Sequence, residues 1–292
     1  MKEKFKGVFP ALLTPFDKNG AINTDSIKKL VEFNVKKGVN GFYVGGSSGE
    51  GLLLTVEERK QLFKAAAEAN EGRTTLIAHV GTICTDHAIE MAKYAKEVGF
   101  DAISAVAPYY YGFGYDAIKN YYLDIVNSVD MPMIIYNFPN ANGFNFTKAI
   151  AEEMFAASDR FIGIKHTTSD LYLLQQFKTM SANPVVYNGW DEMFVAGLSM
   201  GADGGIGSTY NFLQDDILAI YAAFKKGDLK KAMEVQEKVN RIIEAMIPFG
   251  VFAMEKAILT ELGIPMGDCR KPFLPLSEAG KAKAKEIAAT LK

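Results

Sequence analysis

The feature that most constrains this chain is a regular alternation of short apolar runs with longer amphipathic segments. The runs recur about every 20–35 residues, which is the length of one strand–helix unit. Strands that alternate with helices predict a parallel sheet, and eight such units favour a closed (β/α)₈ barrel, the TIM barrel, within the α/β class. The eight runs are residues 8–13, 41–44, 75–80, 102–106, 133–136, 161–165, 185–188 and 204–206.

The segments between these runs have the periodicity of helices. Ile27, Leu30 and Val31 share one face of a helix. Thr55 followed by Glu58 fits a capping box at the start of the next helix. Further helices are expected over residues 86–98, 115–128, 148–155, 171–180 and 192–200.

The chain continues well beyond the eighth run. An apolar stripe that begins at Ala232 predicts a helix, and two more helices are expected before the end of the chain. We interpret this region as the eighth barrel helix plus a C-terminal helical extension from about residue 228 to residue 292. Because no low-complexity linker interrupts the chain, residues 1–292 are expected to form a single domain.

Composition excludes several classes of function. The formal net charge of −2 offers no basic field for nucleic acid. The longest apolar runs fall far short of the roughly 20 residues that span a bilayer, so no membrane partner is expected. The two cysteines, Cys84 and Cys269, cannot form a disulfide framework, which indicates a reduced, cytoplasmic protein.

Lys165 ends an apolar run, so it projects from a buried strand. In an α/β barrel the reactive groups lie at the carboxyl ends of the strands. One interpretation is a lysine that snorkels to solvent or forms an ion pair. The other is a desolvated amine, because burial disfavours the ammonium and exposes the neutral nucleophile. The position favours the second, a nucleophilic lysine that can form a Schiff base.

Two more candidate features follow neighbouring runs. Residues 45–51 (GGSSGEG) form a turn in which backbone N–H groups and the hydroxyls of Ser47 and Ser48 can bind an anion, unless it is a plain glycine-rich loop. A carboxylate fits better than a phosphate, because no Lys or Arg is adjacent. Tyr136 ends the run before the lysine run and is either a rim aromatic or a phenol that transfers a proton.

Asp191 and Glu192 follow the seventh run. They either cap the helix after them, since acids favour a helix N-terminus, or hydrogen-bond to substrate hydroxyls. The histidines His79, His87 and His166 lack metal-ligand spacing, and there is no cysteine cluster. The sequence therefore predicts no metal ion, and a Schiff base formed by Lys165 requires no organic cofactor.

Five motifs resemble the dihydrodipicolinate synthase superfamily over essentially the whole chain. They are residues 11–16 (ALLTPF), 43–50 (YVGGSSGE), 135–139 (IYNFP), 163–167 (GIKHT) and 205–209 (GIGST). The synthase branch typically carries an arginine soon after the Tyr-Asn-x-Pro motif, and residues 140–143 (NANG) contain none. Residues 189–192 (GWDE) are instead similar to the N-acetylneuraminate lyase branch.

The resemblance implies a role for each matching residue. Ser47 and Ser48 would hold the pyruvyl carboxylate, and the hydroxyl survives at Ser48, where the family often has Thr. Asp191 and Glu192 would bind the glycerol tail of a sialic acid. Tyr110 would reach the site of a neighbouring subunit in a homotetramer. The other residues implied to line the sugar pocket are Thr167, Gly189, Gly207, Ser208 and Phe252.

The resemblance also implies the reaction, a reversible cleavage of N-acetylneuraminate to N-acetylmannosamine and pyruvate. Lys165 would form the Schiff base, and Tyr136, with Ser47 and Thr167 nearby, would remove the proton from the C4 hydroxyl. Two alternatives within the superfamily stay open, a 2-keto-3-deoxy sugar acid aldolase and an enzyme like dihydrodipicolinate synthase. A third, from another class, is a barrel that binds pyruvate or a sugar acid without catalysis.

Overall fold

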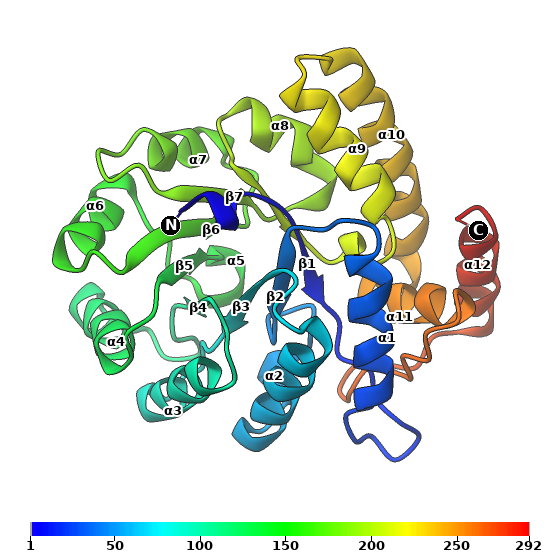
Figure 1. Ribbon diagram of the computed structural model, residues 1–292, viewed down its shortest axis with the longest axis horizontal. Helices are drawn as coiled ribbons and strands as arrows, with labels where there is room; N and C mark the ends of the chain where they lie inside the picture. The colour runs from blue at the N-terminus through cyan, green and yellow to red at the C-terminus, as the bar shows by residue number, and fades with distance from the viewer. Residues whose placement is uncertain (1, 292) are drawn as a thin grey trace.

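The computed structural model describes residues 2–291 and contains a closed barrel of eight parallel strands in sequence order (Figure 1). The strands are β1 (Gly7–Leu12), β2 (Gly41–Val44), β3 (Thr75–His79), β4 (Ala102–Val106), β5 (Met133–Asn137), β6 (Phe161–His166), β7 (Val185–Asn188) and β8 (Gly204–Gly207). Their ends differ by no more than one residue from the expected runs. The predicted (β/α)₈ barrel is therefore confirmed.

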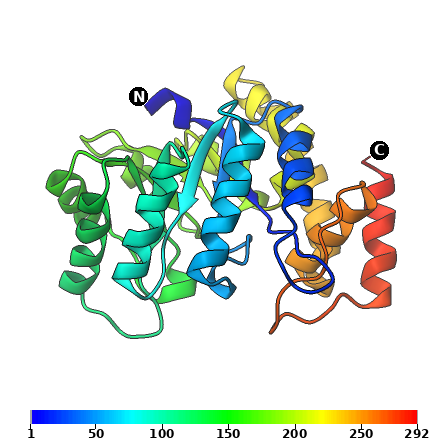
Figure 2. The same ribbon diagram turned by 60° about the horizontal axis from the view of Figure 1, so that its bottom comes forward.

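Helices surround the barrel and extend beyond it. The outer ring is α1 (Thr24–Val35), α2 (Val56–Asn70), α3 (Thr85–Glu97), α4 (Tyr115–Ser128), α6 (Lys148–Ala157), α7 (Leu171–Lys178), α8 (Phe194–Ser199) and α9 (Gln214–Lys225). Shorter segments are α5 (Pro139–Asn142), η1 (Lys2–Phe5), η2 (Gly51–Leu53), η3 (Asp191–Met193), η4 (Thr209–Asn211) and η5 (Ile247–Phe249). The extension is α10 (Leu229–Met246), α11 (Val251–Glu261) and α12 (Glu278–Ala289), which stands beside the barrel in Figure 2.

The eighth barrel helix differs from the expectation. The apolar stripe from Ala232 lies in α10, whereas the helix that follows β8 and packs on β1 is α9. Sequence patterns miss α9 because Leu213 occupies its N-cap position and provides no capping side chain. Helix α10, with the stripe from Ala232, is therefore the first helix of the extension and not the eighth barrel helix. It packs against α9.

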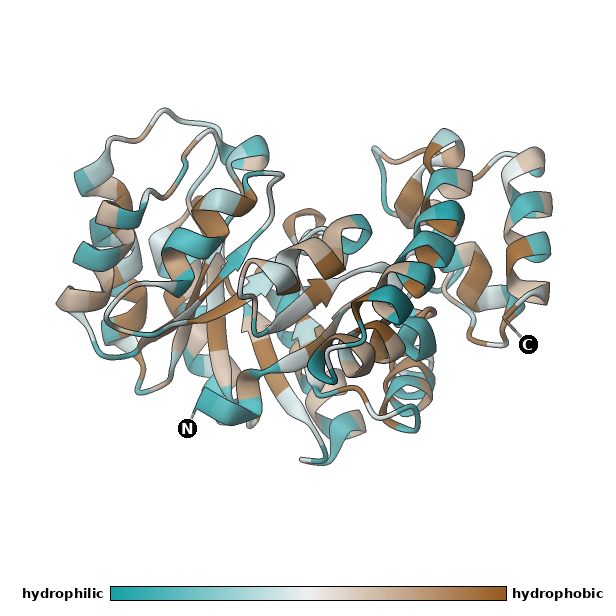
Figure 3. Ribbon diagram, turned by 90° about the horizontal axis from the view of Figure 1, so that it is seen from above, coloured by the Kyte–Doolittle hydropathy of each residue, from teal (hydrophilic) through white to brown (hydrophobic). Residues whose placement is uncertain are grey.

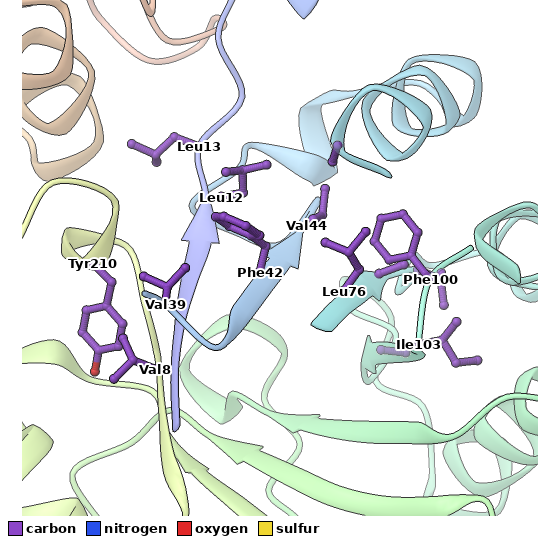
Figure 4. Packing of buried hydrophobic residues seen from close by; sticks show 14 of the residues in the cluster. Val8, Leu12, Leu13, Val39, Phe42, Val44, Leu76, Phe100, Ile103 and Tyr210 are labelled. Atoms are coloured by element: carbon purple, nitrogen blue, oxygen red, sulfur yellow. The ribbon is translucent and has the colours of Figure 1, made fainter. Parts of the chain in front are cut away.

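Every strand is buried on both faces, so two hydrophobic cores share the sheet. The outer core lies between the sheet and the helices, and Figure 4 shows Val8, Leu12, Phe42, Val44 and Leu76 within it. In Figure 3 the helices carry teal and brown bands, as amphipathic helices do. The inner core fills the barrel and consists of Phe5, Phe9, Ala11, Tyr43, Ile77, Ala102, Val106, Ile134, Tyr136, Ile162, Val185, Tyr187 and Ile206.

No helix within residues 2–291 has both the length and the apolar character needed to cross a membrane. The longest helix of the extension, α10, has one apolar stripe and a charged opposite side. It packs on α9 through that stripe, as expected for a helix on the surface of a folded domain.

The predicted capping box at the start of α2 is confirmed. The Glu58 N–H donates to Thr55 Oγ1 at 3.2 Å, and the Thr55 N–H donates to Glu58 Oε2 at 2.8 Å. Two backbone donors of the first helical turn are thereby satisfied. The box fixes the start of α2 shortly after the turn that carries Ser47 and Ser48.

Thr55→Ala should lower the free energy of unfolding by about 1 kcal/mol, because the Glu58 N–H loses its acceptor. Urea denaturation would measure the change. Thr55→Ser retains the hydroxyl and should stay within about 0.5 kcal/mol of the parent protein. Equal losses in the two variants would contradict the capping role.

Candidate active site

A cavity of about 310 Å³ opens at the carboxyl ends of the barrel strands. Its wall combines strand ends, the loops that follow them and the start of α11. All the predicted site residues except Tyr110 line it, namely Ser47, Ser48, Tyr136, Lys165, Thr167, Gly189, Asp191, Glu192, Gly207, Ser208 and Phe252. Residues from six strand ends and from the extension thus meet in one place.

Lys165 lies on the inner face of β6 and is only 5% exposed. Its Nζ lies 4.1 Å from the ring centre of Tyr136 and 4.5 Å from that of Tyr43. Within residues 2–291, Lys165 takes part in no ion pair. The buried ion pair at this end of the barrel is formed by Lys256 and Glu50. The lysine therefore neither reaches solvent nor forms a salt bridge, which excludes the first interpretation of this residue.

Tyr136 pairs with Lys165 in the register of β5 and β6. Its ring stacks on Phe138 at a centroid distance of 5.6 Å. The edges of Tyr43 and His79 meet it at 6.0 and 5.8 Å. These rings surround the amine with apolar surface and hold the Tyr136 ring beside the lysine.

The serine turn, residues 45–51, is held by its own backbone. The Glu50 N–H donates to Ser47 O and the Gly51 N–H to Gly46 O, each at 3.0 Å. A Cβ at Gly51 would lie 1.9 Å from the Gly45 carbonyl oxygen, so only glycine permits this tight turn. Ser47 and Ser48 are half-buried and face the cavity.

A buried arginine and histidine support this turn, and sequence reasoning missed the arginine. Arg59 donates to the carbonyl oxygens of Gly81 at 3.0 Å, Gly45 at 3.4 Å and His79. His79 Nδ1 lies 3.1 Å from Gly45 O, and the Val106 N–H donates to Nε2 at 3.2 Å, so the proton is on Nδ1. Burial, followed by the charge of Arg59, holds the pKa of His79 well below its usual range. Burial also lowers the pKa of Arg59 to about 10.

The hydroxyl of Thr167 is buried and, among residues 2–291, has no hydrogen-bond partner. A Cβ at Gly189 would lie 1.9 Å from this oxygen, so the glycine leaves room for it. A buried hydroxyl without a partner at the wall of a cavity is available to a ligand.

Asp191 does not cap a helix, so that interpretation is wrong for this residue. Its Oδ2 accepts the Thr209 N–H at 2.8 Å and the Thr209 hydroxyl at 2.6 Å. Its Oδ1 faces Gly207, where a Cβ would lie 1.9 Å away. Burial raises the pKa of Asp191 to about 6. Glu192, in contrast, is exposed at the rim.

Tyr110 lies outside the cavity of its own chain. It is 87% exposed, has a φ of +76°, and contacts Tyr111 edge-on at 5.0 Å. Tyr111 and Phe113 are exposed too, at 62% and 38%. The loop after β4 thus presents an aromatic surface to its surroundings, and any role of Tyr110 in a site requires a second chain.

The described residues contain no group of three or more His, Cys, Asp or Glu side chains that could hold a metal ion. The chemistry available in the cavity is that of an amine, hydroxyls, a phenol and carboxylates.

The chain is similar throughout its length to known proteins. The model of the dihydrodipicolinate synthetase family matches residues 4–291. The N-acetylneuraminate lyase of Rhizobium meliloti is 40% identical over 98% of this chain and 95% of its own. N-acetylneuraminate lyase 2 of Escherichia coli O6:H1 is 42% identical over 95% of this chain and 92% of its own.

Solved structures agree with these relatives. A Clostridium difficile protein solved in complex with mannosamine has a TM-score of 0.95 at 36% identity, with 98% of this chain and 99% of that chain covered. The sialic acid aldolase of Ruminococcus gnavus, solved as a catalytic lysine mutant, has a TM-score of 0.96 at 34% identity, with 99% and 96% covered. This chain therefore belongs to the dihydrodipicolinate synthetase family.

Proposed function

We propose that this chain is a Schiff-base aldolase that reversibly cleaves N-acetylneuraminate to N-acetylmannosamine and pyruvate. The observation that carries the proposal is the buried, unpaired amine of Lys165 at the cavity wall beside Tyr136. The relatives named N-acetylneuraminate lyase, and the relative described with a catalytic lysine, support the same chemistry.

The first step forms the imine. Neutral Lys165 Nζ attacks the C2 ketone of the open-chain substrate to give a carbinolamine. Tyr136 donates its phenol proton to the departing hydroxyl, so loss of one water leaves an iminium and a Tyr136 phenolate. The hydroxyls of Ser47 and Ser48 bind the carboxylate at C1, which orients C2 toward the amine.

The second step breaks the bond between C3 and C4. Tyr136, with Ser47 and Thr167 nearby, takes the proton of the C4 hydroxyl, and the electrons of the broken bond move into the iminium to give an enamine. The C4 carbon leaves as the aldehyde of N-acetylmannosamine. Protonation of the enamine at C3 and addition of water to the iminium then release pyruvate and restore Lys165.

The opposite end of the cavity suits a polyhydroxyl tail. Asp191, Glu192 and Ser208 supply acceptors and a hydroxyl there, and Phe252 supplies an apolar wall. Lys165 is the only cationic side chain among the described residues that line the cavity. A second substrate carboxylate would therefore lack a counter-charge, which favours a sialic acid over the substrate of the synthase branch.

We also propose that the chain assembles as a homotetramer. The exposed aromatic surface formed by Tyr110, Tyr111 and Phe113 is suited to burial against a second copy. In that arrangement Tyr110 reaches the cavity of the neighbouring subunit. The unpaired thiols of Cys84 and Cys269 fit the reducing cytoplasm as the place of action.

Lys165→Ala should abolish both pyruvate release and trapping by borohydride, because the imine cannot form. Tyr136→Phe should slow turnover roughly 10²–10⁴-fold, since an acid–base group is lost, and the imine should still form. Mass spectrometry after borohydride treatment with pyruvate, run beside a coupled assay for pyruvate release, measures both. An adduct on a residue other than Lys165 would falsify the mechanism.

Asp191→Ala should lower kcat/KM for N-acetylneuraminate at least ~10-fold more than for a 2-keto-3-deoxy sugar acid with a shorter tail, because a hydrogen bond to the tail is lost. Glu192→Gln, at the rim, should cause a smaller loss. Asp191→Asn can still accept the hydrogen bond from Thr209, so comparison with Asp191→Ala shows how much of the loss in kcat/KM comes from that hydrogen bond. Equal losses for the long and the short substrate would instead favour the keto-deoxy acid aldolase.

A second buried acid lies behind the tail end of the cavity. Glu255 of α11 is fully buried, and neither of its oxygens has a hydrogen-bond partner among residues 2–291. Burial raises the pKa of Glu255 to about 8, and the nearby hydroxyl of Ser208 acts in the opposite direction. The carboxyl is therefore neutral in the folded protein at neutral pH.

Glu255→Gln should stabilise the protein increasingly as the pH rises. The folded protein retains the proton up to about pH 8, whereas the unfolded chain loses it near the ordinary pKa of 4.5. The free energy of unfolding therefore falls by about 1.4 kcal/mol per pH unit within that window. Urea denaturation at pH 6.5 and pH 8 measures the effect above the pKa of Asp191. If the difference in free energy of unfolding between parent and variant is the same at the two pH values, Glu255 does not retain its proton in the folded protein.

A further inference from the structure

The serine turn and the extension are joined by an ion pair that the proposed mechanism does not use. Glu50 Oε1 pairs with Lys256 Nζ of α11, and both side chains are at most 1% exposed. It is the one ion pair in the described part of the chain in which both partners are this deeply buried. The two residues are 206 positions apart in the sequence.

Neighbouring groups complete the hydrogen bonding of the pair. Glu50 Oε2 accepts the N–H of Arg270 at 2.6 Å. Lys256 Nζ also donates to Asp268 O at 3.3 Å and lies 4.3 Å from the ring centre of Phe16. The carboxylate and the ammonium are thus both satisfied by rigid neighbours, so the geometry of the pair is strictly defined.

One partner of the pair has an unfavourable backbone conformation. Glu50 has a φ of +55°, in the left-handed region that residues with a Cβ rarely adopt. A buried ion pair also brings little net stability, because desolvation of two charges offsets their attraction. Stability alone therefore gives a weak reason for this arrangement.

Both partners are close to the substrate site. Glu50 follows Ser48 by two residues, and its N–H donates to Ser47 O at 3.0 Å. Lys256 lies one helical turn after Phe252, on the same side of α11. Val251 and Phe252 line the tail end of the cavity, whereas Ser47 and Ser48 line the carboxylate end.

We propose that Glu50 and Lys256 are positioning residues that hold the serine turn at a set distance from α11. This inference rests on the proposed function, in which the turn binds the carboxylate of the keto acid and α11 closes the tail pocket. Neither residue touches the substrate. The pair sets the spacing between the two halves of the site. Its loss therefore weakens binding of the keto acid more than it changes the positions of the Lys165 amine and the Tyr136 phenol.

Glu50→Asp tests the spacing with the charge retained. Aspartate tolerates the left-handed conformation at least as well as glutamate, so the main change is a carboxylate withdrawn by one carbon–carbon bond. In the condensation direction, KM for pyruvate should rise about 10- to 100-fold, because a shift of this size misplaces the hydroxyls of the turn. KM for N-acetylmannosamine should remain near that of the parent protein.

The double variant Glu50→Gln/Lys256→Met separates positioning from stability. It removes both charges together, so neither partner is left buried and unpaired, and thermal unfolding should stay close to that of the parent protein. KM for pyruvate, and the pyruvate concentration that gives half-maximal borohydride trapping at Lys165, should nevertheless remain raised. Lys178→Met/Asp203→Asn, which removes a partly buried pair outside the cavity lining, is the matched control and should leave both values unchanged.

Two outcomes overturn the positioning role. The first is a folded double variant that has the pyruvate KM of the parent protein. The second is loss of folding in both Glu50→Asp and the double variant, since the pair would then be purely structural. Failure of the proposed function is seen earlier and separately, as a parent protein that gives no pyruvate-dependent adduct on Lys165. In that case there is no keto-acid binding for the pair to support, and the positioning role is overturned too.

Discussion

The removal of water from the amine of Lys165 is the constraint on which the rest of the site depends. The side chain is 5% exposed and lies against the faces of Tyr43 and Tyr136, which offer a cation only partial compensation for lost hydration. Among residues 2–291, no carboxylate forms an ion pair with it. An imine requires the lone pair of the amine, and no ion pair has to be broken before Lys165 can react. Barrel closure provides this environment, because it brings Tyr43 of β2, across the barrel, and Tyr136 of the neighbouring strand β5 against the amine.

Charge is distributed unevenly along the cavity. Buried Arg59 and Lys165 lie near the serine turn, and among residues 2–291 no acid forms an ion pair with either. Asp191, Glu192 and Glu255 lie at or behind the opposite end, where burial raises the pKa of Asp191 and Glu255. A substrate with a carboxylate at one end and neutral hydroxyls at the other suits this distribution, since its carboxylate lies toward Arg59 and the iminium that Lys165 forms, and its hydroxyls meet the acceptors. The ion pair of Glu50 and Lys256 joins the two ends without adding net charge to either.

Much of this architecture was predictable from local patterns. The eight strands were found because each is a short apolar run bounded by turns, and the capping box at Thr55 and Glu58 has a three-residue signature. Helix α9 was missed because Leu213 gives it no capping signal. Arg59 was missed for a different reason. An arginine on an amphipathic helix usually faces solvent, and only the packed barrel shows that this one turns inward to the carbonyl oxygens of Gly45, in the serine turn, and of Gly81.

Local sequence patterns are enough to predict which chemical groups stand at the ends of the strands, because the order of a parallel barrel brings those ends to one face. Lys165, Tyr136, Ser47 and Thr167 are predicted to meet on that basis, and they do line one cavity. Which charges are compensated, in contrast, depends on the folded molecule. The pairing of Glu50 with Lys256 depends on barrel closure and on the docking of the extension, which bring together residues 206 positions apart, and no local pattern encodes a contact of that range.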